Sequence, residues 1–148
     1  MSDAVNCEAS MLEKMYKNMR MGSDSAIKII ERAGGEDFKR ELTEQLDGYE
    51  TFAEKIKARL HEIGYKEKEE GILAKMGVSI GMAMNTIADS SDSHLAQMTV
   101  EGSTMCVTDT LKILREYENT SVSECAMKIA RDIVSFEEKN VETMKKFI

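Results

Sequence analysis

The chain has 148 residues, a formal net charge of −7, twelve methionines and no proline. This length predicts a single domain, residues 1–148, that is large enough to bury a core. Without proline, long helices can form without kinks, and turn signals at the spacing of an all-β domain are missing. Lys and Arg form no cluster, so we do not expect the chain to bind nucleic acid. An all-α domain is the expected fold class.

The cysteines and the N-terminal sequence bear on the compartment. Cys7, Cys106 and Cys125 are odd in number and widely spaced, which favours a reducing compartment over a disulfide framework. The stretch "MSDAVNCEAS" lacks the basic start and apolar centre of a secretory signal. We expect a cytoplasmic protein.

Apolar residues recur at the three-to-four spacing of helices through most of the chain. The expected helices cover about residues 8–33, 36–63, 70–88, 90–118 and 121–147. The turn "AGGED" should end the first helix, with Gly34 or Gly35 in the left-handed conformation, and Gly64 should end the second. So short a turn makes the first two helices an antiparallel hairpin.

Residues 71–88 are apolar almost throughout, with Lys75 as their only charge. A stretch of about 18 residues approaches the length that spans a membrane. Asn85, Lys75 and three glycines argue against that role. We expect instead a helix that is buried on more than one side or that self-associates. Gly77 and Gly81 would let another helix approach it closely.

The connection between the second and fourth expected helices can follow one of two routes. A crossover of roughly 25 residues, at about 1.5 Å per helical residue, can travel the length of a bundle. The helix at 90–118 would then start at the end where the helix at 36–63 began. The alternative is an up-and-down bundle with one long, bent third helix.

The helix at 90–118 has two apolar faces. One is formed by Leu95, Met98, Met105 and Ile113, and the other by Val100, Val107, Leu111 and Leu114. A helix in an isolated four-helix bundle needs only one such face. We therefore expect a homodimer, formed through residues 71–88 and this second face.

Four helices of near-equal length, with the long connection between the second and third, resemble the ferritin-like superfamily. The layout is similar to small uncharacterised bacterial members with a rubrerythrin-type bundle. The resemblance implies a ferritin-like four-helix bundle with an additional apolar crossover helix. In active members of the superfamily it also implies a di-metal centre, with a Glu on each of two helices and a Glu-x-x-His on each of the other two.

The metal motif of that superfamily is missing from this chain. Three residues before His61 stands Ala58, and three residues before His94 stands Ser91. The nearest departure is Glu137-x-x-Asn140, in which an asparagine stands where the histidine would be. Asparagine is a poor ligand for iron, zinc or manganese compared with imidazole. The superfamily's di-metal site is therefore not expected here.

A hydrogen-bonded network is expected in place of a metal centre. When the helices are placed antiparallel, the polar residues that fall at mid-height are Ser23, Gln45, Tyr49, Glu101 and Glu137, with Asn140 about one turn away. A buried carboxylate is costly unless it is hydrogen-bonded or protonated, and hydroxyl and amide groups are suitable donors. Such a network can fix the register of helices.

Three functional interpretations remain. The preferred one is a non-catalytic bundle that acts through self-association or partner binding, with no catalytic residue, metal or cofactor. The alternative is a redox or storage protein that binds iron or manganese through His94, Glu101, Glu137 and Asn140. A third is a small apolar ligand between helices that are interrupted by Gly22, Gly48 and Gly102. Close approach of helices is the other explanation for those glycines.

Overall fold

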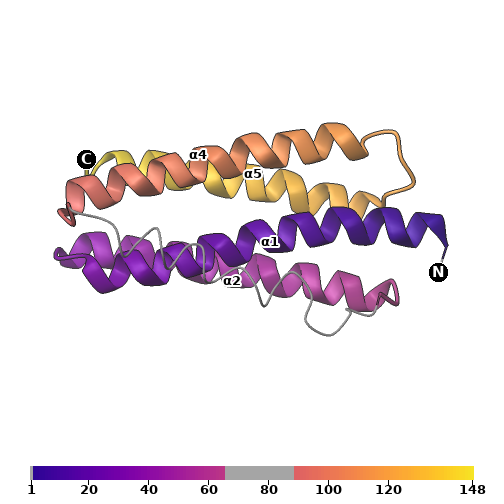
Figure 1. Ribbon diagram of the computed structural model, residues 1–148, viewed down its shortest axis with the longest axis horizontal. Coiled ribbons are helices and arrows are strands. Elements are labelled where there is room, and N and C mark those ends of the chain that lie inside the picture. Colours follow the sequence, from indigo (N-terminus) through magenta and orange to yellow (C-terminus); the bar gives the residue numbers. More distant parts are fainter. Residues whose placement is uncertain (1, 66–88) are drawn as a thin grey trace.

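The computed structural model describes residues 2–65 and 89–148, which form four long helices (Figure 1). They are α1 (Asp3–Arg32), α2 (Glu36–Glu62), α4 (Asp92–Tyr117) and α5 (Glu124–Lys145). The all-α fold and the four-helix bundle are thereby confirmed. The expected helix at 70–88, and with it the apolar crossover, lies outside the described residues. No helix within the described ranges has the length and apolar character needed to cross a membrane.

Serine side chains define where three of the helices begin. The hydroxyls of Ser2, Ser91 and Ser123 each accept a hydrogen bond from a backbone N–H three residues later, at 3.2 Å. A serine at this position satisfies one of the free N–H groups of the first turn. The cap at Ser2 explains why α1 begins at Asp3, five residues earlier than the periodicity of its apolar residues indicated.

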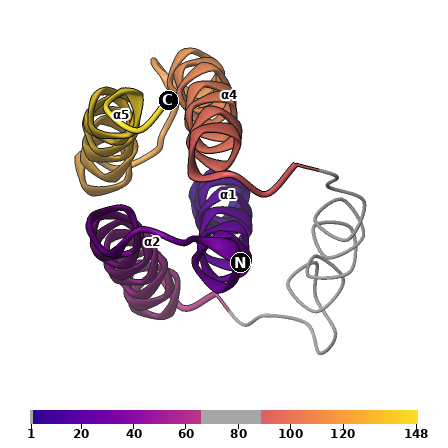
Figure 2. The ribbon, with the colours of Figure 1, turned by 90° about the vertical axis from the view of Figure 1, so that its left-hand side faces the viewer.

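The four helices form a square when viewed along the bundle (Figure 2). Helix α1 lies beside α2 and α4, and α5 lies diagonally across from α1. Figure 1 shows that α2 and α4 run in the same direction, opposite to α1 and α5. Helix α4 therefore begins at the end of the bundle where α2 begins, as the crossover route requires and the up-and-down alternative does not.

A carboxylate fixes this end of the bundle. The two oxygens of Asp92, in the first turn of α4, accept hydrogen bonds from the backbone N–H groups of Gly34 and Gly35, both at 2.8 Å. The turn between α1 and α2 is thus held against the start of α4. The expected left-handed cap at Gly34 or Gly35 is wrong, because among the described glycines only Gly64 has a positive φ, 77°. Asp92 satisfies the turn's amides instead, and Gly64 ends α2 as expected.

The core consists of two apolar halves. One contains Met11, Leu12, Met15, Met19, Tyr49, Ala53, Ile56, Ile113, Ile129 and Ile133, and the other contains Ile29, Phe38, Leu42, Leu95, Ala96 and Met144. Along each helix, at least one buried polar residue lies between the residues that belong to one apolar half and those that belong to the other. These polar residues are Ser23, Gln45, Ser103, Glu137 and Asn140. We call these five residues the polar layer. It divides the interior of the bundle.

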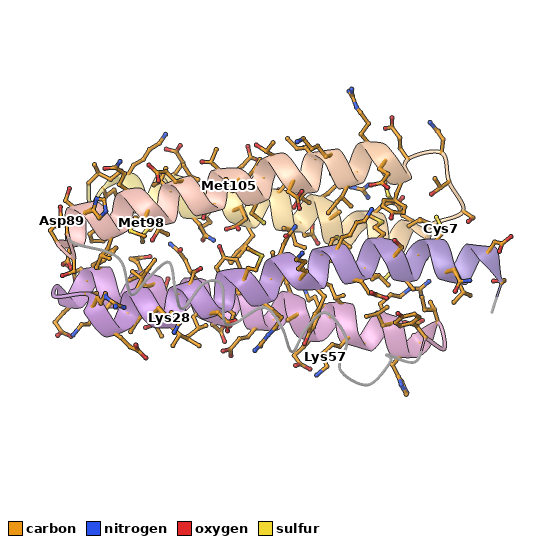
Figure 3. The ribbon with its side chains drawn as sticks, viewed as in Figure 1. Cys7, Lys28, Lys57, Asp89, Met98 and Met105 are labelled. Atoms are coloured by element: carbon orange, nitrogen blue, oxygen red, sulfur yellow. The ribbon has the colours of Figure 1, made fainter. Side chains whose placement is uncertain are left out.

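The two apolar faces of α4 differ in their burial. On the first face Leu95 and Ile113 are buried as expected, but Met105 is 73% exposed (Figure 3). With about 100° of rotation per residue, Met105 lies about 80° around the helix from each of them, which places it outside the core. On the second face Val100 and Leu114 pack against the core, whereas Leu111 is 50% exposed.

Replacing Asp92 with alanine removes both hydrogen bonds to the turn between α1 and α2. We expect this change to lower the free energy of unfolding by about 1–2 kcal/mol, since hydrogen bonds to a charged group exceed neutral ones in strength. Urea unfolding followed by circular dichroism measures the loss. Asp132→Ala is the matched control, because it removes only a surface ion pair with Lys128, worth about 0.5 kcal/mol or less. Equal effects of the two changes would contradict the role given to Asp92.

Candidate functional site

The polar layer is centred on the carboxyl group of Glu137, which is 1% exposed. Its Oε1 accepts hydrogen bonds from the hydroxyl of Tyr49 at 2.6 Å, the hydroxyl of Ser103 at 3.1 Å and the side-chain N–H of Asn140 at 2.9 Å. These donors come from α2, α4 and α5. One oxygen atom therefore connects three helices in the middle of the bundle.

Spacing along α5 explains how Glu137 comes to be buried. Ile133, Glu137, Asn140 and Met144 succeed one another at intervals of four, three and four residues, and all are buried. Residues at these intervals share one face of a helix. The face that packs against the core thus carries two polar residues between two apolar ones, which is the local reason for the polar layer.

Two glycines allow the ring of Tyr49 to reach this position. A Cβ atom on Gly22 of α1 would lie 2.3 Å from Tyr49 Cε1, and one on Gly48 of α2 would lie 2.2 Å from Phe136 Cε1. The rings of Tyr49 and Phe136 meet edge to face, with their centroids 5.1 Å apart. Gly22 and Gly48 therefore serve close packing, the simpler of the two explanations that the sequence offered.

Burial controls the protonation of the groups in the layer. Desolvation raises the pKa of Glu137 above its ordinary value, and hydrogen bonds from Tyr49 and Asn140 oppose that rise in part. Burial and the nearby carboxyl of Glu137 also raise the pKa of Tyr49 and of the Cys106 thiol. Both groups are consequently uncharged near neutral pH. A thiol held in its protonated form is a poor nucleophile, which argues against covalent chemistry at Cys106.

A second buried carboxylate shows the contrasting case. Glu8 of α1 is 4% exposed and accepts a hydrogen bond from Arg59 Nε at 2.6 Å and another from the Ser123 backbone N–H at 2.8 Å. Burial alone would raise the pKa of Glu8, but Arg59 and the Ser123 amide lower it below its ordinary value. Glu8 and Arg59 thus form an ordinary buried ion pair. The hydrogen-bond donors to Glu137 carry no positive charge.

The structure brings together some of the predicted network and leaves out one residue. Tyr49 and Asn140 bind Glu137, and Ser23 and Gln45 are buried in the same layer, 1% and 5% exposed. Glu101 does not belong to the layer, contrary to expectation. It is exposed and accepts a hydrogen bond from Gln97 at 3.2 Å.

Ser103 takes the place in the layer that was expected for Glu101. Two residues correspond to about 200° of rotation around a helix, so Ser103 faces the core when Glu101 faces solvent. The sequence contained a signal for this: Ala96, Ser103 and Thr110 are small residues seven apart, and all three are buried. Seven-residue spacing keeps side chains on one face of a helix.

The alternative metal ligands are not assembled into one site. His94 lies in the first turn of α4, where its backbone N–H donates to the Ser91 cap, and Glu101 is exposed. Of the four candidates, Glu137 and Asn140 are the pair in contact, at 2.9 Å. Within residues 2–65 and 89–148, no group of three or more His, Cys, Asp or Glu side chains is placed to hold a metal ion.

Comparisons with protein-family models, with curated proteins and with solved structures find no match to this chain. The function must therefore be argued from the geometry of the bundle.

Glu137→Gln tests the protonation of the polar layer. The pKa of Glu137 is raised on folding from its ordinary value of 4.5, so the stabilisation associated with the protonated form is complete below that pH. It is lost as the pH rises through the pKa of the folded state. Glutamine keeps an uncharged acceptor, so we expect wild type to lose stability relative to Glu137→Gln as the pH increases above about 4.5.

Urea unfolding at a series of pH values measures this difference. Glu138→Gln is the matched control, because Glu138 is exposed and adjacent in sequence. Its difference from wild type should not follow the same course. A difference between wild type and Glu137→Gln that stays constant with pH would show that the buried carboxyl does not titrate as described.

Proposed function

We propose that this chain is a non-catalytic bundle of ferritin-like layout that acts through self-association, as a homodimer. The observation that carries the proposal is the half-exposed Leu111 on the second apolar face of α4. Val100 and Leu114 of that face pack on the core, so Leu111 and the half-buried Val107 are left for a partner. Residues 71–88, the other part of the expected interface, lie outside the described residues.

The ferritin-like assignment is supported by how the helices are connected. Two antiparallel hairpins, α1–α2 and α4–α5, are joined by a connection between opposite ends of the bundle, with α2 and α4 parallel. A single long crossover of this kind is one of the known connectivities of four-helix bundles and the one that ferritin-like proteins use. The layout speaks for the fold and carries no activity with it.

The absence of catalysis is supported by the composition of the polar layer. Its single carboxyl, that of Glu137, has three uncharged protein donors on one oxygen. A di-metal centre of the ferritin type needs several carboxylates and two histidines directed at the same place. The polar layer supplies one carboxylate, two amides and two hydroxyls, from Glu137, Gln45, Asn140, Ser23 and Ser103, with the Tyr49 hydroxyl beside them.

Leu111→Gln tests the interface. We expect the variant to weaken the dimer roughly tenfold or more, since burying a leucine contributes about 1.5–3 kcal/mol and tenfold corresponds to about 1.4 kcal/mol. Size-exclusion chromatography with light scattering at several concentrations measures the change. Met105→Gln is the matched control, an exposed apolar residue on the same helix about 240° around from Leu111. A wild-type protein that remains monomeric at high concentration would refute the proposal.

Elemental analysis of the purified protein, before and after treatment with a chelator, tests the non-catalytic assignment. We expect iron, manganese and zinc well below one equivalent per chain, and unfolding that does not change on chelation. Three protein groups already donate to the buried carboxyl, and no group of three metal-ligating side chains is placed to hold an ion within the described ranges. Near-stoichiometric iron or manganese that protects the fold would favour the redox or storage alternative.

A further inference from the structure

We propose that the groove between α1 and α4 binds a small uncharged molecule with an apolar body and a head group that both accepts and donates hydrogen bonds, such as a primary carboxamide. This ligand site is independent of the self-association proposed above. It uses the side of α4 that carries Met98 and Met105, and the proposed interface uses the side that carries Leu111.

The groove has a volume of about 950 Å³, which lies within the range of small-molecule sites. Its walls come from α1 and α4, and it reaches inward to Gln45 and Tyr49 of α2 and Glu137 of α5. It therefore leads from the surface to the polar layer. The exposed charged side chains of Lys14, Lys17, Asp109 and Lys112 also line it.

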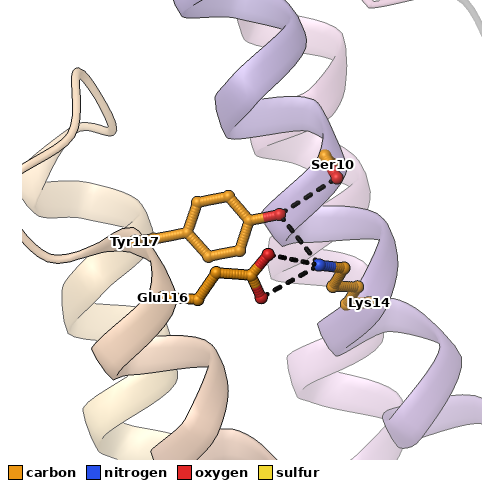
Figure 4. A network of polar contacts seen from close by, with 4 residues as sticks. All are labelled: Ser10, Lys14, Glu116 and Tyr117. Atoms are coloured by element: carbon orange, nitrogen blue, oxygen red, sulfur yellow. Dashed lines mark hydrogen bonds and ion pairs between the residues drawn. The ribbon is translucent and has the colours of Figure 1, made fainter.

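Polar contacts join α1 and α4 at both ends of the groove, and Asn18, which lines it, donates a hydrogen bond to Asp109 at 2.6 Å. Toward one end of the pair, Lys14 donates to both oxygens of Glu116, at 3.0 and 3.1 Å, and to Tyr117, whose hydroxyl donates to Ser10 (Figure 4). At the other end Asp92 holds the turn that follows α1. The helices are fixed on both sides of the groove.

Gly102 leaves space between these fixed ends. It lines the groove, and a Cβ atom there would meet no described part of the chain within 4 Å, in contrast to Gly22 and Gly48. Met21, Met98 and Met105 line the same groove. Methionine side chains are flexible and adapt to apolar ligands of irregular shape. The part of the wall formed by these methionines thus suits an apolar body.

Gln45 specifies one half of the head group. Its side chain is 5% exposed and lines the groove, and its Nε2 is the buried side-chain nitrogen or oxygen that has no hydrogen-bond partner among the described residues. A buried donor without an acceptor is costly. A carbonyl oxygen of the ligand would satisfy this N–H group.

Glu137 specifies the other half. The hydroxyl and amide donors of Tyr49, Ser103 and Asn140 all bind Oε1, so Oε2 receives none of these three hydrogen bonds. The Cys106 thiol also hydrogen-bonds to the carboxyl, but a thiol is a weak donor and leaves room for a stronger one. Glu137 on α5 and Gln45 on α2 line the same groove. An N–H group of the ligand would donate to Oε2. A carboxylate head group offers no such N–H, and an ammonium head group offers no acceptor to Gln45, so an uncharged amide satisfies both residues.

The chain contains two glutamines, Gln45 and Gln97, so labelling glutamine side chains with ¹⁵N gives two amide signals with a built-in control. Gln97 is exposed on α4 and bound to Glu101. We expect titration with octanamide to shift the NMR signal of the Gln45 side chain and leave that of Gln97 unchanged. Octanoate and octylammonium, with the same chain length, should bind at least several-fold more weakly.

Two variants and one control test whether the shift reports this groove. Gly102→Leu fills the open space and should weaken octanamide binding roughly tenfold or more, whereas Gly102→Ala should leave binding within about threefold. Gln45→Met removes the unpaired donor at similar size and should abolish the preference for octanamide over octanoate. Circular dichroism shows whether each variant is folded.

The proposal is overturned if octanamide does not shift Gln45 at low millimolar concentration, or if it shifts both glutamines alike. It is also overturned if folded Gly102→Leu binds as well as wild type. Equal binding of the three probes would show an apolar groove without the proposed head-group selection, which contradicts the proposal as well. None of these measurements depends on the oligomeric state. The ligand proposal can therefore be refuted while the homodimer proposal holds, and the homodimer proposal can be refuted while the ligand proposal holds.

Discussion

A carboxyl group buried without a positive charge is the constraint on which the rest of the bundle depends. Glu137 cannot leave the interior without taking Ile133 and Met144 with it, since all three share one face of α5. Its Oε1 must therefore find donors within the protein, and it finds them on α2, α4 and α5 itself. Apolar packing tolerates small sliding of one helix along another. A hydrogen bond of 2.6–3.1 Å does not, so the polar layer fixes the register of three helices.

The fourth helix, α1, is held in a different way. It contributes Ser23 to the polar layer, and hydrogen bonds from Lys14, Asn18 and the turn at Gly34 connect it with α4. Its contact with α2 is closer, because Gly22 receives the ring of Tyr49. Helix α1 is thus packed tightly on one neighbour and tied to the other at a few points. This difference between its two neighbours is the physical origin of the groove.

Much of this arrangement could be predicted from the sequence, and the parts that could not have identifiable causes. The spacing of apolar residues gave the four helices, and counting residues along antiparallel helices gave the common height of Tyr49, Glu137 and Asn140. The same count wrongly placed Glu101 inward. The residue of α4 that faces the core at this height is two positions later, and two positions turn a side chain to the opposite side of a helix. Helix α4 is ambiguous in this respect, with apolar residues on two faces. The hydrogen bonds that the backbone N–H groups of Gly34 and Gly35 donate to Asp92 join residues 58 and 57 positions apart, and nothing local in the sequence signals them.

The three mid-helix glycines show how one sequence feature can have two physical meanings. Each costs roughly 1 kcal/mol of helix stability relative to alanine, so each requires a compensating gain. At Gly22 and Gly48 the gain is visible, because an aromatic ring occupies the space that a side chain would fill. At Gly102 no group of residues 2–65 or 89–148 lies within 4 Å of that space, although Gly102 is one residue away from Ser103, which binds Glu137. At a glycine that serves packing, another group of the protein occupies the space beside its Cα, as the aromatic rings do at Gly22 and Gly48. Gly102 instead lines the groove that leads to the polar layer. There Gln45 Nε2 has no partner among the described residues, and Glu137 Oε2 receives none of the hydrogen bonds from Tyr49, Ser103 and Asn140.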